Sequence, residues 1–387
     1  MNRFYFDHNA TTPVSSEVLE TLVAVLRDVW GNASSIHYWG QAAKQRLETA
    51  RRQVAALIGA RPPEIVFLSG GTEADNLAIL GTVRRASAPR KHVITTAIEH
   101  PAVLATCAQL EREGVEVTYL PVSSEGLVDP DDVRRALRRE TVLVSVMHAN
   151  NEIGVIQPLR EIARITREAG VVFHSDGVQA LGKIPVNVEA LGVDLYSLSG
   201  HKIYAPKGIG ALYVRRGTPL APILYGGHHE RDRRPGTENV PGAAALGAAA
   251  SWVQAHLESE AARLAALRDR LERGILERVP QVSVNGGNAP RTPNTTNISF
   301  AGIEGEAMVI ALDLKGFAVS TGSACSSGAI EPSHVLTALG LSPDKAKASV
   351  RFSLGRSNTE QQVDALIEAV AEVAARLRRL SPTYCHA

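Results

Sequence analysis

The stretch EIVFLSGGTEADN, residues 64–76, decides the fold class of this sequence. Residues 64–69 form a short run of apolar and β-branched side chains, which is typical of a buried strand. Gly70 and Gly71 follow, and a helical pattern begins at Thr72. The stretch therefore predicts a strand that ends in a glycine turn and leads directly into a helix.

The same strand–helix unit recurs along the chain. Alternation of this kind predicts an α/β fold with a mostly parallel central sheet and helices on both faces. The connection between the last two strands is too tight for a crossover helix, so we expect one antiparallel pair there. The further strands are expected at 92–97, 115–120, 141–147, 170–176, 194–200 and 210–214, and the helices at 72–86, 101–113, 130–139 and 158–169.

A long Ala-rich helix begins near residue 241 and is expected to lead into a smaller C-terminal α+β domain. The expected division is an N-terminal segment, 1–14, that packs on the small domain, a large domain, 15–260, and the small domain, 261–387. The small domain is expected to have strands near 282–284, 295–300 and 349–354 and helices near 304–313, 332–339 and 359–379.

Composition excludes several classes of protein. The 387 residues carry a formal net charge of +1, whereas nucleic-acid-binding proteins usually show a strong basic excess. Three cysteines in a chain of this length do not make a disulfide framework and fit a reducing cytosol. No run approaches the ~18 apolar residues of a membrane span, and the N-terminus has no apolar signal-peptide core. We therefore expect a cytoplasmic protein without membrane or nucleic-acid partners.

Polar residues follow most of the predicted strands. Ligands of an open parallel sheet bind at the carboxyl ends of its strands, so these residues are expected on one rim. Each alone is more often a turn, a cap or a core residue. Together they are hard to explain by folding, because burial of unpaired polar groups is costly. They are Gly71, Thr72, His100, Asn151, Asp176, Gln179, Ser199, His201 and Lys202.

One nucleotide-binding motif is excluded. Residues 177–183, GVQALGK, nearly fit a P-loop, but the next residue is Ile184 rather than the Ser or Thr that binds magnesium. No strand-linked GxGxxG is present, and no metal site is expected.

The polar groups expected at this rim are those that pyridoxal phosphate requires. Its aldehyde forms a Schiff base with a lysine, and its pyridinium nitrogen pairs with an aspartate. We therefore predict that Lys202 is the Schiff-base lysine and that Asp176 holds the ring nitrogen. The glycines that precede Thr72 are expected to admit the phosphate to a helix N-terminus, with Ser199 and His201 beside it.

Four motifs carry a family resemblance: SGHKIYAPKGIGALYVR, GGTEADN, NNEIGVIQP and RPGTEN. They resemble the class V aminotransferase superfamily of fold-type I pyridoxal-phosphate enzymes. With STGSACSSG (320–328) and VRFSLGR (350–356), essentially the whole chain resembles the group I cysteine desulfurases.

The resemblance implies a role for each matching residue. Arg351 grips the substrate carboxylate, and Asn151 contacts both the ring and the substrate. Thr237, in RPGTEN, reaches the phosphate of a partner subunit, which implies a homodimer. The remaining implied roles are the phosphate turn for Gly71, Thr72, Ser199 and His201, stacking on the ring and proton transfer for His100, and an amide near the phenolic oxygen for Gln179.

Cys325 is the residue that the resemblance makes catalytic. It takes the sulfur of L-cysteine as a persulfide and passes it to an acceptor protein, such as an iron–sulfur scaffold, while alanine is released. Its neighbours are small and cannot build a core, so we expect a mobile loop. Cys107 lies in a helical pattern and is interpreted as a packing residue, and Cys385 lies close to the C-terminus.

Three other functions compete with this one. A selenocysteine lyase would share almost every motif, and a generic class V aminotransferase or lyase would share the cofactor site without needing Cys325. A non-catalytic sulfur-relay partner is disfavoured because Lys202, Asp176 and His100 are all present. The sequence leaves the acceptor pathway open.

Overall fold

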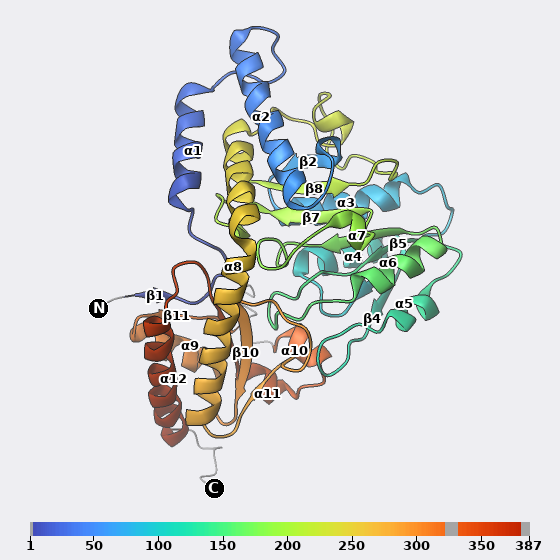
Figure 1. The fold of residues 1–387 in the computed structure, drawn as a ribbon. Coiled ribbons are helices and arrows are strands. Elements are labelled where there is room, and N and C mark those ends of the chain that lie inside the picture. The colour runs from blue at the N-terminus through green and yellow to red at the C-terminus, as the bar shows by residue number, and fades with distance from the viewer. Residues whose placement is uncertain (1–2, 322–331, 381–387) are drawn as a thin grey trace.

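The computed structural model describes residues 3–321 and 332–380. Within these ranges a seven-stranded sheet lies at the centre of the larger part of the molecule (Figure 1), in the order β2-β8-β7-β6-β5-β3-β4. All strands run in one direction except β8, which is antiparallel to both of its neighbours. The mostly parallel sheet and the antiparallel pair are thus confirmed. The strands are β2 (Ile65–Leu68), β3 (His92–Thr96), β4 (Glu116–Leu120), β5 (Thr141–Ser145), β6 (Val172–Asp176), β7 (Leu195–Ser199) and β8 (Gly210–Val214).

Helices cover both faces of this sheet. In β2, Ile65 and Phe67 join a core formed with α2, α6 and α8, whereas Val66 and Leu68 join a core formed with α3. Successive strand residues point to opposite faces, so both faces must be apolar. The helices of this part are α1 (Ser16–Asp28), α2 (Tyr38–Leu57), α3 (Gly71–Arg85), α4 (Pro101–Arg112), α5 (Pro130–Ala136), α6 (Leu159–Glu168) and α7 (Val188–Leu191).

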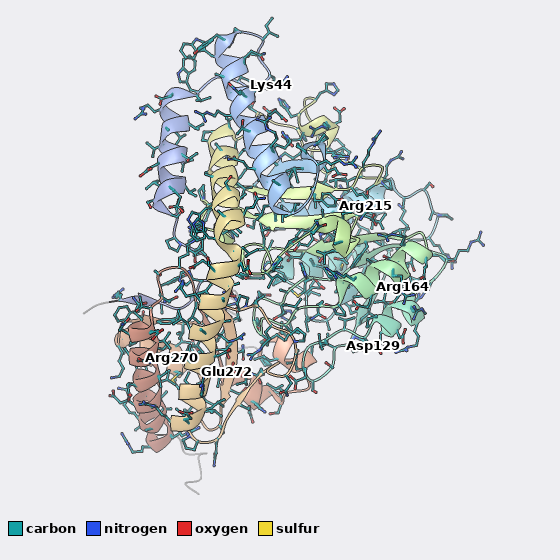
Figure 2. All side chains as sticks on the ribbon, in the orientation of Figure 1. Lys44, Asp129, Arg164, Arg215, Arg270 and Glu272 are labelled. Atoms are coloured by element: carbon teal, nitrogen blue, oxygen red, sulfur yellow. The ribbon has the colours of Figure 1, made fainter. Side chains whose placement is uncertain are left out.

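Helix α8 (Val240–Arg278) connects the two parts of the molecule, as Figure 1 shows. Its small side chains up to Val253 pack into the core beneath the large sheet. Leucines spaced three and four residues apart, from Leu264 onward, pack into a second core. In Figure 2, Arg270 and Glu272 leave α8 in different directions: Arg270 bonds to α12, and Glu272 bonds to β10.

The second core lies between helices and a three-stranded antiparallel sheet, β12-β10-β9. The N-terminal strand β1 (Phe4–Tyr5) pairs in parallel with β11 (Phe317–Ala318), and Phe6 is buried in the same core. This part contains β9 (Val282–Val284), β10 (Thr295–Phe300), α9 (Gly305–Leu314), α10 (His334–Ala338), α11 (Pro343–Lys347), β12 (Ser349–Ser353) and α12 (Glu360–Leu380).

No helix in the described part of the chain is both long enough and apolar enough to cross a bilayer.

Candidate active site

A cavity of about 300 Å³ opens at the carboxyl ends of the central strands. Residues from five strand ends, from the N-terminal segment and from β12 line it, so the fold brings together segments that are far apart in the sequence. Its lining is Asn9, Ala10, Gly71, Thr72, Asp75, His100, Met147, Asn151, Asp176, Val178, Gln179, Ser199, His201, Lys202 and Arg351.

One wall of the cavity is the N-terminus of α3. The backbone N–H groups of a first helical turn have no intrahelical acceptor, and the helix dipole favours an anion there. A Cβ atom at Gly71 would lie 2.9 Å from Cγ2 of Val178 and 3.5 Å from Cβ of Ser199. Only glycine therefore fits this turn without displacing its neighbours. The cradle fits the phosphate of pyridoxal phosphate.

Two buried carboxylates lie at the inner end of the cavity. Asp176, at the end of β6, accepts a 2.9 Å hydrogen bond from the Val178 N–H. Burial raises the pKa of Asp176, although His100, this hydrogen bond and Lys202 oppose the shift. Burial and Asp176 together raise the pKa of Asp75, whose Oδ1 has no hydrogen-bond partner among the described residues. A ligand N–H carrying positive charge, such as the pyridinium nitrogen of pyridoxal phosphate, would stabilise this end.

Lys202 lies in the short 3₁₀ turn that follows β7. Its Nζ donates to the carbonyl oxygens of Asn9 and Ala10, the latter at 2.7 Å. The N-terminal segment therefore holds the amine in the cavity that also contains Asp176. This is the amine that covalent attachment of an aldehyde requires.

His100 is the N-cap residue of α4, and its Nδ1 accepts a 3.1 Å hydrogen bond from the Ala102 N–H. Burial in the cavity lowers the pKa of His100, and the charge of Lys202 lowers it further, while Asp176 opposes the shift. The imidazole is therefore neutral at neutral pH, and its backbone contact fixes its position at the rim.

Arg351 projects from β12 into the cavity. Its Nη1 donates to the Asn151 carbonyl at 3.0 Å, and its Nη2 donates to the Asp7 carboxylate at 2.7 Å. Its Nε is buried and has no partner among the described residues. Nη1 and Nη2 each carry a second hydrogen, so the guanidinium has donor capacity for a substrate carboxylate, the group that it binds best.

The sequence analysis missed two polar residues of the lining. Asp75 follows Thr72 by three residues and therefore lies on the same face of α3, a spacing that could have identified it. Asn9 belongs to the polar run Asp7-His8-Asn9, which interrupts an otherwise apolar segment.

Asn9 is almost fully buried and joins three segments of the chain. Its Nδ2 donates to the Asn151 carbonyl at 3.1 Å and to Oγ1 of Thr295 at 2.9 Å. Its Oδ1 accepts from Lys183 at 3.1 Å and from Asn294 at 3.0 Å. This side chain therefore links the cavity to both parts of the molecule.

One predicted site residue of the described part of the chain is not part of the cavity lining. Thr237 is exposed on the loop before α8. Cys325 lies outside the described residues, as does Cys385. Cys107 is buried in α4 with a free thiol, and burial raises its pKa to about 12, which fits a packing role. Among the described residues no group of His, Cys, Asp and Glu side chains could hold a metal ion.

Residues 4–366 match the family model for aminotransferase class-V. The chain is 50% identical over 382 residues to a cysteine desulfurase of Nostoc sp., covering 99% of this chain and 95% of the relative. A solved structure titled NifS-like protein is similar with a TM-score of 0.90 and 36% identity, covering 97% of this chain and 100% of the other. A structure titled SspA in complex with cysteine is similar with a TM-score of 0.80 and 39% identity, covering 90% and 98%.

Enzymes of this kind depend on pyridoxal phosphate, and the α3 cradle, the buried carboxylates and the amine of Lys202 fit that cofactor. Sequence identity of 50% over 382 residues, together with a cavity lined by these groups, supports a single family assignment. The chain belongs to the class-V aminotransferases, and among them to the cysteine desulfurases.

Proposed function

We propose that this desulfurase converts L-cysteine to L-alanine, holds the sulfur as a persulfide on Cys325 and passes it to an acceptor. The observation that best supports the proposal is the cavity lining shared by Lys202, Asp176 and Arg351, which combines an amine, a buried carboxylate and a guanidinium. A similar solved structure is titled SspA in complex with cysteine, which favours the same substrate here. The role of Cys325 rests on the sequence resemblance.

The reaction balances without an external oxidant. The thiolate of Cys325 attacks the substrate sulfur, so an S–S bond forms and the C–S bond of cysteine breaks. The electron pair of that bond stays with the carbon fragment, which gains a proton and leaves as alanine. Sulfur is thereby oxidised, carbon is reduced, and the enzyme is left with a Cys–S–SH group. Thiolate rather than thiol is the nucleophile, so the Cys325 proton must leave first.

Bound pyridoxal phosphate supplies an aldehyde that binds amines covalently and a ring that withdraws electrons from the substrate α-carbon. The chain supplies the rest. Lys202 provides the amine that holds the aldehyde between turnovers, and Asp176 keeps a proton on the ring nitrogen. Arg351 orients the substrate carboxylate, and His100 is our candidate for moving protons at the rim.

Replacement of Asp176 by asparagine should lower turnover by about 10²–10³-fold, because one preorganised charge in a buried site is lost. The substitution is nearly isosteric, so cofactor should still bind and the protein should still fold. Alanine formation at saturating cysteine measures the effect. A near-normal rate would show that Asp176 does not serve the ring.

Replacement of Arg351 by alanine should mainly weaken cysteine binding. A charge-assisted hydrogen bond contributes about 1.5–3 kcal/mol, which corresponds to a rise in KM of about 10- to 150-fold. Arg351→Lys should recover part of the loss, because it restores the charge without the bidentate geometry. An unchanged KM would point to another clamp. Arg356 is the alternative from the sequence, although it stacks on Trp252 outside this cavity.

We further propose a homodimer in which Thr237 reaches the partner's phosphate site. Exposure of Thr237 on a loop outside its own cavity supports this proposal, as does an exposed apolar surface on and after α1, which includes Leu26, Trp30 and Ile36. Sedimentation should give twice the 41.3 kDa chain mass, and Leu26→Asp together with Trp30→Asp should shift the protein toward monomer. A wild-type monomer with full activity would contradict the dimer.

Three further properties of the enzyme are proposed: its compartment, its sulfur acceptor and its division into domains. We infer a cytoplasmic enzyme, because its chemistry requires reduced thiols and the cytosol keeps them reduced. We propose an iron–sulfur scaffold as the acceptor, with tRNA thiolation as the alternative pathway. We also propose a division into 1–14, 15–260 and 261–387, which is supported by two separate cores that both include residues of α8.

The proposed function is tested by adding cysteine and a reductant to the protein and measuring sulfide and alanine together. Equal amounts of both are expected. Transfer of the amino group to a keto acid without sulfide would favour the generic aminotransferase. Activity with selenocysteine and none with cysteine would favour the selenocysteine lyase.

A further inference from the structure

Lys183 is a buried lysine that the proposed chemistry does not use. It ends the P-loop-like run 177–183 after β6, and its side chain is 7% exposed. Its Nζ donates to Oδ1 of Asn9 at 3.1 Å and to Oε1 of Gln179. Burying an amine is costly, so a lysine here needs a reason beyond filling space.

The contact fixes the side-chain amide of Gln179 in one orientation. A lysine amine donates hydrogen bonds, so the group that faces it must be the oxygen Oε1. The amide nitrogen Nε2 then lies on the opposite side, where one of its hydrogens goes to the Asn9 carbonyl at 3.0 Å. Its second N–H remains for the cavity that Gln179 lines. The amide is therefore presented to the cavity as a donor.

We propose that Lys183 is a positioning residue that makes Gln179 an obligatory hydrogen-bond donor, so that this point of the cavity accepts only an oxygen with a lone pair. This inference rests on the proposed function in one respect: it takes the cavity as the cofactor site, where the phenolic oxygen of pyridoxal phosphate would be that acceptor. With Lys183 absent, the 3.0 Å bond to the Asn9 carbonyl still favours this orientation, but the amide is no longer held in it from both sides.

The orientation of the Gln179 amide does not depend on whether Lys183 is charged. Burial lowers its pKa well below the usual range, and the charges of Lys202 and Arg351 lower it further. A neutral amine still has two N–H groups, which matches the two oxygens that it contacts. The neutral amine also has a lone pair, but Nε2 of Gln179 is engaged by the Asn9 carbonyl, so Oε1 faces Lys183 in either protonation state.

The test is a double-mutant cycle on the cofactor-loaded enzyme, read by the pH midpoint of its visible absorbance band. Loss of a donor to the phenolic oxygen makes that oxygen hold its shared proton more tightly. Lys183→Met and Gln179→Leu should each raise the midpoint by about one pH unit or more. Because Lys183 acts through Gln179, adding Lys183→Met to Gln179→Leu should cause no further shift.

Two variants complete the design. Lys183→Arg keeps donors at this position and should restore the wild-type midpoint, and Lys347→Met, on the exposed surface of α11, should not change it. If Lys183→Met does not fold, Lys183→Gln enters the cycle in its place.

A Lys183→Met shift that persists in the Gln179→Leu background would overturn the inference, because Lys183 would then act through its own charge. A midpoint unchanged by Lys183→Met would also overturn it. A wild-type protein that shows no visible band with pyridoxal phosphate would overturn the proposed function and this inference together.

Discussion

Replacement of Lys202 by alanine is expected to leave a folded protein that binds pyridoxal phosphate only reversibly and turns over cysteine no faster than the free cofactor. The contacts of Nζ that are lost include those with the carbonyls of Asn9 and Ala10, two residues that line the cavity. The α3 cradle and Asp176 are untouched. What is lost is the amine that, among the described residues lining the cavity, can hold the aldehyde in place.

Absorbance after dialysis and alanine formation measure the two effects of this variant. The wild type should keep its yellow colour on dialysis, and the variant should lose it. Lys207→Ala is the matched control, because Lys207 lies five residues further on and is exposed. Normal colour together with normal turnover in the Lys202 variant would refute the assignment of the covalent lysine.

Replacement of Cys325 by serine is expected to abolish alanine formation from cysteine without loss of colour. No residue of the described cavity lining is altered, so cofactor and substrate should still bind. A serine hydroxyl is far less ionised and far less nucleophilic toward sulfur than a thiol, of which a few per cent is thiolate at neutral pH. Cys385→Ser, which changes a thiol near the C-terminus, should retain full activity.

An assay of the Cys325→Ser variant with selenocysteine as substrate distinguishes the desulfurase from the competing functions. Selenium can leave without attack by a thiol, so residual activity with selenocysteine is compatible with the proposal. A Cys325→Ser enzyme that still makes alanine from cysteine at the wild-type rate would contradict it. That result would favour a generic class V lyase, which has no need for this thiol.

The sheet could be predicted from the sequence because most of its strands are buried on both faces and end in glycine turns or polar residues. Residues 64–69 show the pattern, and β2 lies within them. Helices α1 and α2 were not predicted. The buried face of α2 consists largely of small residues such as Gly40, Ala43 and Ala50, whose apolar periodicity is weak. These helices form because α8 offers a surface on which they pack.

The cavity residues at strand ends could also be predicted, because the carboxyl ends of parallel strands meet at one edge. Asn9 and Lys183 could not. Asn9 contacts Thr295 across 286 positions and Lys183 across 174, and no local pattern reports contacts of that range. Thr237 differs again, since the role that we propose for it depends on a second chain.

The location of the transferred sulfur tests the central claim most directly. The wild-type enzyme is incubated with cysteine without reductant and then digested. The masses of its cysteine-containing peptides are measured by mass spectrometry. One additional sulfur atom is expected on the peptide that contains Cys325, and none on those that contain Cys107 or Cys385. A persulfide found only on another cysteine, or on none while alanine accumulates, would contradict the account.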